Sequence, residues 1–347
     1  MSAGAARPGR AGAARLWLRL FWLSALLTLA VGATLVPHLR DSAELVRMRN
    51  ALLLQSAPAA YDWTPAAVPA DFARETAAPL PLYADIVAGN QLKVAGDDWA
   101  TALAIGRHLL PDGRRSGGAI QADLTDTYTR ITQQGEGYCG DYADSFTGFA
   151  TAAGVFSRPW AFSFDGFGGH GHILNEIWDS QRARWIMIDV FNNFYVTDAS
   201  GQPLSAMAFR AALQAGATDI KLVPVDPLAR PGFKIEDKAI DYYRRGLPEW
   251  YMWWGNNVFE YDQAPLVRAL GGVHRAAEQL GGVASGVHPG IRILATEQNT
   301  ERREAMQSLK WRLHAAVLLG VASLVLLLAW VFARARSRKR QGLEARS

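Results

Sequence analysis

The sequence predicts an α+β fold in which a helix packs on an antiparallel sheet, flanked by two transmembrane helices. Three observations lead to this prediction. Apolar runs long enough to cross a bilayer lie near both ends of the 347-residue chain. A helical pattern begins near residue 139, directly after two glycines. Two alternating segments separated by a polar turn follow at 172–190, as in a β-hairpin.

The two apolar runs predict transmembrane helices at residues 16–36 and 311–333. The tails at 1–15 and 334–347 are both basic. Basic flanks stay on the cytoplasmic side of a membrane, so both termini are predicted to be cytoplasmic. We therefore expect a protein of the bacterial inner membrane, in contact with its lipid bilayer, whose central part lies in the periplasm.

A cleaved signal peptide is the alternative for the first span, because Val31-Gly32-Ala33 fits the small-residue cleavage rule. The apolar run is longer than the usual core of a signal peptide, which favours an uncleaved anchor.

Between the spans, composition predicts three regions. Residues 37–80 are rich in proline and predict a periplasmic linker. Residues 81–235 have the length of one domain. Residues 236–310 are rich in aromatic residues and then helical, which predicts a stalk returning to the membrane. The dense aromatic run at 242–257 has three interpretations: a core segment, an interfacial helix, or a platform for a ligand.

Cys139 is the single cysteine of the chain and lies where a helix is predicted to begin. Gly135 and Gly137 interrupt the preceding element, and Gly154 marks the predicted end of the helix. At a helix N-terminus, free backbone N–H groups and the helix dipole favour a thiolate and can also hold an oxyanion. The alternative is that Cys139 is a small buried apolar residue.

The alternating segments predict a hairpin that turns about Ser180–Gln181 and places His172 opposite Asp189. Opposed residues of two strands lie about 5 Å apart at Cβ, within reach of a carboxylate–imidazole contact. Cys139, His172 and Asp189 therefore have the order of a thiol nucleophile, its base and the group that orients the base. His170 competes for the role of base, but it lies in a glycine-rich loop rather than on a rigid strand.

Four short motifs together resemble the transglutaminase-like superfamily, whose core is related to papain-type cysteine peptidases. They are Gly137-Tyr138-Cys139-Gly140-Asp141-Tyr142-Ala143, then Ala152-Ala153-Gly154-Val155 with Arg158, then His172 with Glu176, and Ile188-Asp189. The resemblance covers roughly residues 80–200 and implies a Cys139–His172–Asp189 triad on a transglutaminase-like core. A glutamine ahead of the nucleophile supplies an oxyanion donor in papain-type enzymes, which makes Gln133 a candidate here.

The expected function is acyl transfer from a cell-envelope amide borne by a protein, a peptide or a polysaccharide. The acyl group would pass from Cys139 to water, as in a peptidase or amidase, or to an amine, as in a transglutaminase. Hydrolysis is preferred because water is the default acceptor. The alternative is a catalytically inactive module that binds or assembles partners in an envelope pathway.

The distribution of charge and the spacing of potential metal ligands argue against nucleic-acid-binding and metal-binding proteins. The net charge of +4 comes from basic residues concentrated at the two ends, so no nucleic-acid partner is expected. No cluster of His, Cys, Asp or Glu has metal-ligand spacing, so neither a metal nor another cofactor is predicted. A single cysteine excludes an internal disulfide.

Overall fold

The computed structural model describes residues 10–58, 60–110, 118–120 and 122–344. The chain divides into two compact units, one of residues 1–52 with 307–347 and the other of residues 53–306. The stop at Pro111-Asp112-Gly113, predicted after the helix at Gly96–Leu110, and parts of both predicted cytoplasmic tails lie outside the described residues.

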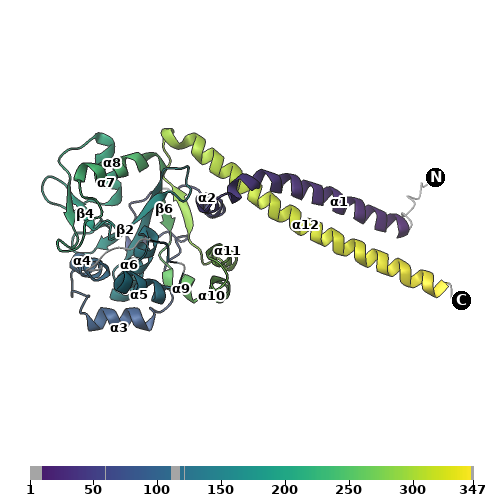
Figure 1. Cartoon of the computed structure of the whole chain (residues 1–347), viewed down its shortest axis with the longest axis horizontal. Helices are drawn as coiled ribbons and strands as arrows, with labels where there is room; N and C mark the ends of the chain where they lie inside the picture. Colours follow the sequence, from purple (N-terminus) through teal and green to yellow (C-terminus); the bar gives the residue numbers. More distant parts are fainter. Residues whose placement is uncertain (1–9, 59, 111–117, 121, 345–347) are drawn as a thin grey trace. The chain divides into compact units, whose positions relative to one another are not determined.

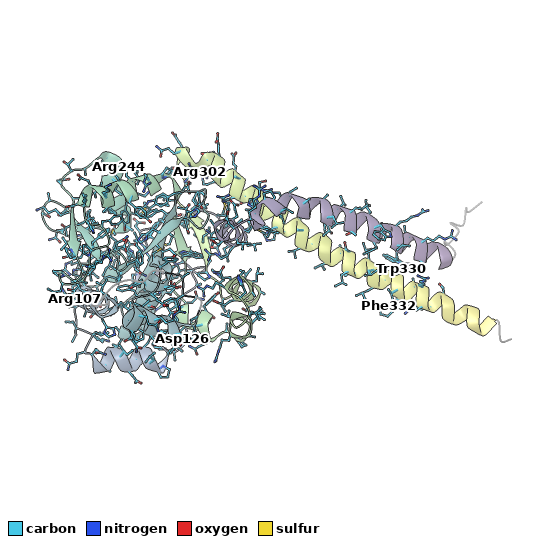
Figure 2. The ribbon with its side chains drawn as sticks, in the orientation of Figure 1. Arg107, Asp126, Arg244, Arg302, Trp330 and Phe332 are labelled. Atoms are coloured by element: carbon cyan, nitrogen blue, oxygen red, sulfur yellow. The ribbon has the colours of Figure 1, made fainter. Side chains whose placement is uncertain are left out.

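The first unit contains two long helices, α1 (Arg10–Leu35) and most of α12 (Thr300–Glu344), together with η1 (Val36–Leu39) and most of α2 (Ser42–Leu53). Both long helices are long and apolar enough to cross a membrane. Their large apolar side chains are exposed, as Phe332 beside Trp330 on α12 illustrates (Figure 2). Ser323 Oγ donates to Ser24 Oγ at 2.9 Å, a helix–helix hydrogen bond of the kind found inside membranes.

The second unit is mixed α+β and is built on a five-stranded sheet of order β3-β2-β1-β6-β7, in which every neighbouring pair is antiparallel. A separate two-stranded sheet pairs β4 with β5. The strands are β1 (Ser157–Ser163), β2 (Gly171–Asp179), β3 (Arg184–Ile188), β4 (Phe194–Thr197), β5 (Lys221–Pro224), β6 (Trp250–Trp254) and β7 (Gly290–Ile293). The helices are α3 (Pro81–Gly89), α4 (Asp98–Leu109), α5 (Leu124–Gln134), α6 (Cys139–Ala153), α7 (Ala206–Ala215), α8 (Glu236–Gly246), α9 (Val258–Gln263), α10 (Pro265–Gly271) and α11 (Arg275–Ser285).

Helices cover both faces of the large sheet (Figure 1). Ile177, Ile186 and Ile188 of β2 and β3 pack in one core with the apolar side of α6 and with α3, α4 and α9. The alternate residues, such as Leu174 and Met187, pack in a second core with α7 and α8. Because side chains alternate along a strand, β2 and β3 contribute to both cores at once.

The aromatic run at 242–257 belongs to this double core. Its five central residues form β6, and all five are buried between β1 and β7. The prediction of a separate helical stalk at 236–310 therefore differs from the structure, which places β6 and β7 in the large sheet. A Trp-rich strand buried on both faces lacks the period-2 alternation by which a strand is recognised, and its composition resembles that of an interfacial helix.

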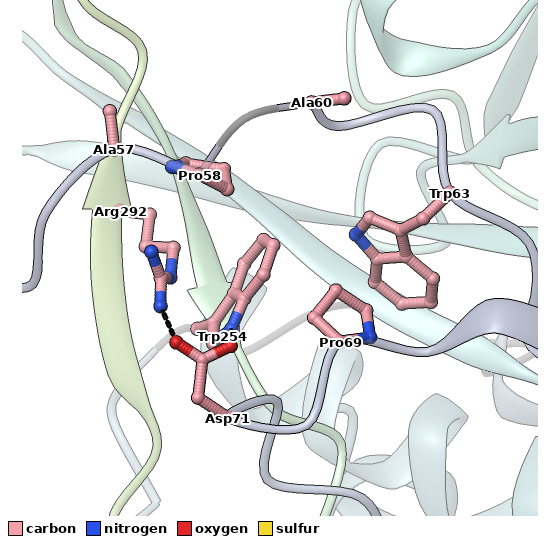
Figure 3. A pocket seen from close by; sticks show the side chains of 8 residues that line it. All are labelled: Ala57, Pro58, Ala60, Trp63, Pro69, Asp71, Trp254 and Arg292. Carbon is pink, nitrogen blue, oxygen red and sulfur yellow. Dashed lines mark hydrogen bonds and ion pairs between the residues drawn. The ribbon is translucent and has the colours of Figure 1, made fainter.

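A hollow of about 480 Å³ is lined by Trp254 of β6 and Arg292 of β7 on one side (Figure 3). The segment that carries Trp63 and Asp71 lines the other side. Arg292 pairs with Asp71, and its guanidinium lies 4.3 Å from the Trp254 ring centroid. These contacts attach the proline-rich segment to the sheet.

A buried ion pair ties β1 to β2. Arg158 lies 2.7 Å from Glu176, and both side chains are about 1% exposed. Glu176 also accepts hydrogen bonds from the Trp160 indole at 2.9 Å and from the backbone N–H of Ala206 at 2.8 Å. The guanidinium lies 3.6 Å from the Trp185 ring centroid. Glu176, which shares a sequence motif with His172, therefore links β1 and β2 to α7.

Replacing Glu176 by Gln should lower the free energy of unfolding by about 3 kcal/mol, because it leaves the buried Arg158 charge uncompensated. The matched control is Asp241→Asn, which removes the partner of Arg244 in an exposed pair and should leave stability unchanged. Guanidinium unfolding of the detergent-solubilised chain, followed by tryptophan fluorescence, measures both. Equal midpoints for the two variants would contradict this account of the ion pair.

Candidate active site

Cys139 is the first residue of α6 and follows a loop whose conformation requires glycine. Gly137 has φ of 103°, in the left-handed region that other residues avoid. The Asp141 carboxylate accepts from the Tyr138 N–H at 2.7 Å, and the first intrahelical bond runs from Tyr142 N to Tyr138 O. The N–H groups of the first turn, from Cys139 to Asp141, therefore lie at the open end of the helix.

The Asp141 carboxylate that caps α6 is half-buried, and its pKa is raised because the effect of burial outweighs the hydrogen bonds from Tyr138 and Ile120.

The α6 helix is fixed to the sheet by a polar contact inside the first core. Asn175 on β2 donates from Nδ2 to the carbonyl of Ala143 at 3.2 Å and to the Thr147 hydroxyl at 2.9 Å. Asn175 is 2% exposed. Since buried amides require partners, this contact sets where α6 lies along β2 and so where Cys139 lies relative to His172.

His172 is the second residue of β2 and is 3% exposed. Its Nε2 lies 2.5 Å from Asp189 Oδ2. Four aromatic rings pack around the imidazole, with centroids 5.7 to 6.1 Å away: Phe162, Phe191, Tyr242 and Tyr243. The ring is therefore held in one orientation by packing as well as by the carboxylate.

Asp189 follows β3 directly and forms an antiparallel bridge with Phe194. Its Oδ1 accepts from the Asn192 backbone N–H at 2.9 Å. Its Oδ2 faces His172, the Tyr243 hydroxyl and the Asn192 side-chain amide, the last at 3.1 Å. The carboxylate is 1% exposed and therefore depends on these donors for the solvation that water would provide.

The hairpin register differs from the sequence prediction by two residues. Asn175 pairs with Ile188, so Asp189 lies at the register position opposite Leu174 rather than opposite His172. The turn is displaced because Asp179 closes it, accepting from the N–H groups of Gln181 and Arg182 at 3.0 and 3.2 Å. An even displacement keeps the two residues on the same face, and the diagonal contact forms.

Cys139 also acts on the histidine electrostatically. Asp189 engages Nε2, which leaves Nδ1 as the other ring nitrogen. Burial by itself would lower the pKa of His172, but the charge of Asp189 and then that of Cys139 raise this pKa to about 10. Cys139 is half-buried.

The pKa of Asp189 moves in the opposite direction. Burial acts to raise this pKa, and the charge of His172 together with the hydrogen bonds from His172, Tyr243 and Asn192 outweighs burial and lowers it. The arrangement thus favours an imidazolium between two acidic groups.

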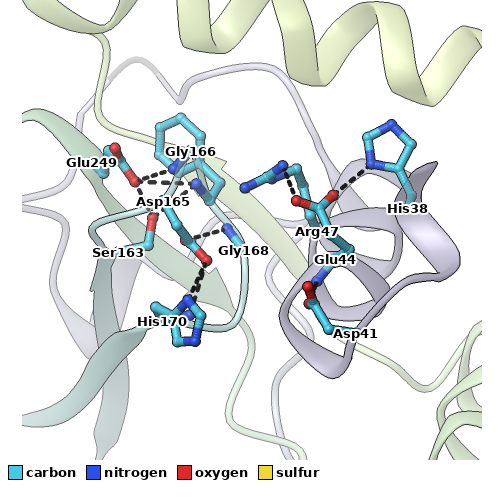
Figure 4. A network of polar contacts seen from close by, with 11 residues as sticks. His38, Asp41, Glu44, Arg47, Ser163, Asp165, Gly166, Gly168, His170 and Glu249 are labelled. Atoms are coloured by element: carbon cyan, nitrogen blue, oxygen red, sulfur yellow. Dashed lines mark hydrogen bonds and ion pairs between the residues drawn. The ribbon is translucent and has the colours of Figure 1, made fainter.

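Two other predicted candidates lie apart from this contact. His170 is 76% exposed and lies 3.3 Å from Asp165, which also accepts from the N–H groups of Gly168 and His170 and so folds the loop (Figure 4). Gln133 lies exposed on the last turn of α5. Its role as an oxyanion donor stays a prediction.

The same view shows two unrelated polar contacts. Glu249, just before β6, accepts from the N–H groups of Gly166 and Phe167 at 2.8 and 3.1 Å (Figure 4). These bonds hold the loop between β1 and β2 at Gly166 and Phe167. In the first unit, Glu44 of α2 lies 2.7 Å from His38 Nδ1.

Sequence reasoning did not identify Tyr243 and Asn192 as parts of the site. Tyr243 lies on α8, 54 residues beyond the aspartate that it contacts. Its only sequence signal is a place on the inward face of an amphipathic helix, which marks a core residue equally well. Asn192 lies three residues after Asp189, in a turn whose geometry the sequence does not specify. Both are positioning residues that hold the Asp189 carboxylate.

Comparison of the chain with models of known protein families, with curated proteins and with solved structures found no match. Among the described residues, no group of three His, Cys, Asp or Glu side chains could hold a metal ion. What the site does is therefore inferred from its own geometry and chemistry.

The His172 pKa predicts how stability depends on pH. The folded-state pKa of about 10 exceeds the usual value of 6.5, so the imidazolium contributes its full stabilisation below pH 6.5 and loses it as pH rises toward 10. The free energy of unfolding should fall over that interval, and His172→Gln should remove most of the fall. The midpoints of guanidinium-induced unfolding at pH 6.5 and at pH 10 measure this fall in stability.

The control for this titration is His170→Gln, which changes an exposed histidine in the adjacent loop and should keep the full pH dependence of the parent. An equal loss of stability in the parent and in His172→Gln would show that the buried pair does not titrate in this way.

Proposed function

We propose that the chain is a membrane-anchored thiol acyl-transfer enzyme with a transglutaminase-like core, in which Cys139 is the nucleophile and His172 the base. One observation carries the proposal. A solitary cysteine is the first residue of a helix, and it acts electrostatically on an imidazole whose Nε2 lies 2.5 Å from a buried carboxylate. A nucleophile, a base and an orienting acid in contact are the parts that thiol acyl transfer requires.

In the first step, the Cys139 sulfur attacks an amide carbonyl carbon, after its proton has passed to His172 Nδ1. The C–S bond forms as the carbonyl π pair moves to oxygen. The N–H groups at the start of α6 would stabilise this oxyanion, since Cys139 is the first residue of that helix. When the oxyanion collapses, the C–N bond breaks and the leaving amine takes the proton from His172.

The second step releases the acyl group. Water attacks the thioester carbonyl, gives a proton to His172, and the Cys139 thiolate leaves as the carboxylic acid product forms. A primary amine in place of water would give a new amide by the same steps. We propose hydrolysis, because Cys139 is half-buried at an open helix end, where water has access.

Asp189, Tyr243 and Asn192 act through the histidine. The Asp189 carboxylate holds the imidazole with Nδ1 directed at the thiol and stabilises the imidazolium that forms in each step. Tyr243 and Asn192 fix the carboxylate by hydrogen bonds to Oδ2. None of the three contacts the reacting atoms, so each is a positioning residue.

We further propose that α1 and α12 anchor the enzyme in the bacterial inner membrane with both termini in the cytoplasm and residues 53–306 in the periplasm. The basic residues that flank both apolar helices support this topology. Its substrate would then be an amide of a cell-envelope protein, peptide or polysaccharide. A fluorescent protein fused after Ser347 should fluoresce and alkaline phosphatase fused there should be inactive, and the reverse result would exclude this topology.

The acylation of Cys139 by p-nitrophenyl acetate tests the proposed chemistry. The detergent-solubilised parent should release a burst of p-nitrophenol and carry an acetyl group on Cys139 by mass spectrometry. Replacing His172 by Gln should slow this acylation by about 100-fold or more, since it removes the general base.

His170→Gln is the matched control, because it removes a histidine two residues away and should leave the acylation rate unchanged. If His172→Gln and His170→Gln acylate at equal rates, Cys139 is an ordinary thiol. The chain would then be better described as a non-catalytic module.

A further inference from the structure

The outward face of α8, the helix whose inward face carries Tyr243, is basic. Tyr243 points inward from α8 to Asp189, whereas Lys238, Asp241, Arg244 and Arg245 line an open hollow of about 450 Å³ on the other side of the helix. Arg244, labelled in Figure 2, is 3.0 Å from Asp241, so these two charges offset each other. Within the part of the chain that the structure describes, Arg245 and Lys238 have no carboxylate partner.

Arg245 is held by aromatic rings rather than by an acid. Its guanidinium carbon lies 5.3 Å from the ring centroid of Phe164 and 5.9 Å from that of Tyr242. The two rings contact each other edge to face, with centroids 5.0 Å apart. A guanidinium over aromatic rings keeps its N–H groups available, and their planar fork matches a carboxylate.

Tyr242 connects this cation to the reacting residues. Its ring centroid lies 5.9 Å from that of His172, and its hydroxyl is 3.5 Å from the carbonyl oxygen of Gly171. Burial raises the pKa of Tyr242, the charges of Cys139 and Asp189 raise it further, and Arg245 lowers it. The Tyr242 ring therefore has Arg245 and His172 as neighbours.

We propose that Arg245, supported by Phe164 and Tyr242, is a substrate-binding residue that recognises a carboxylate a few atoms from the scissile amide bound at Cys139. The inference rests on the proposed function, and it narrows the substrate to amides that carry an acidic group close to the reacting carbonyl. The charge of the hollow supports this choice, because two of its three cations have no carboxylate partner among the described residues.

The control residue for this proposal is its neighbour on α8. Arg244 carries the same charge one position earlier, but its charge is already offset by Asp241. Arg245→Gln and Arg244→Gln thus remove one cation each from the same turn, and only the first removes an unpaired cation that rests on the Phe164–Tyr242 rings.

The test is the alkylation rate of Cys139 by two probes, iodoacetyl-glycine and iodoacetyl-glycinamide, which differ only in a carboxylate against a neutral amide. Because the chain has one cysteine, each rate reports on Cys139 alone. In the full-length, detergent-solubilised protein, Arg245→Gln should slow the anionic probe by about fivefold, as expected for loss of one nearby opposite charge, and leave the neutral probe unchanged. Arg244→Gln should change neither rate appreciably.

An unchanged ratio of the two rates in Arg245→Gln, or an equal drop in Arg244→Gln, would overturn the assignment of Arg245 while leaving the thiol chemistry intact. Failure of both probes to alkylate the parent faster than free cysteine would instead overturn the proposed function and this inference together.

Discussion

The buried contact between His172 and Asp189 is the constraint on which the rest of the site depends. Both side chains are at most 3% exposed, so neither charge is solvated by water. Such a pair is stable only when every remaining polar atom finds a partner. Oδ1 of Asp189 is satisfied by a backbone N–H, and Oδ2 by Tyr243 and Asn192 in addition to the imidazole. The remaining polar atom of the pair is the second ring nitrogen of His172, Nδ1.

The fold brings these groups together because the large sheet is buried on both faces. The residues of β2 that face α6 fix the position of the cysteine helix through Asn175. The alternate residues of the same strand face α8 and its aromatic neighbours, among them His172. One strand thus carries both His172 and the residue that fixes the position of the Cys139 helix. The buried Arg158–Glu176 pair holds that strand to β1 and to α7.

Local pattern predicted much of this arrangement. Glycines at 137 and 154 mark the ends of α6 where left-handed backbone is required, and alternation identified β2 and β3. The register was wrong by two residues, because an Asp179-closed turn is a matter of side-chain hydrogen bonding that periodicity does not report. Tyr243 could not be predicted, since its contact with Asp189 joins distant segments. The strand β6 was missed because its five residues are all buried and show no alternation.

The protonation state of His172 tests the central claim most directly. Nitrogen-15 NMR of the histidine-labelled protein in detergent, with His172→Gln used to assign the signal, reports whether each ring nitrogen carries a proton. With a pKa of about 10, His172 should be an imidazolium with both nitrogens protonated throughout the range from pH 6.5 to near pH 10. A neutral ring, with one unprotonated nitrogen just above pH 6.5, would contradict the account of a buried His172 imidazolium paired with Asp189.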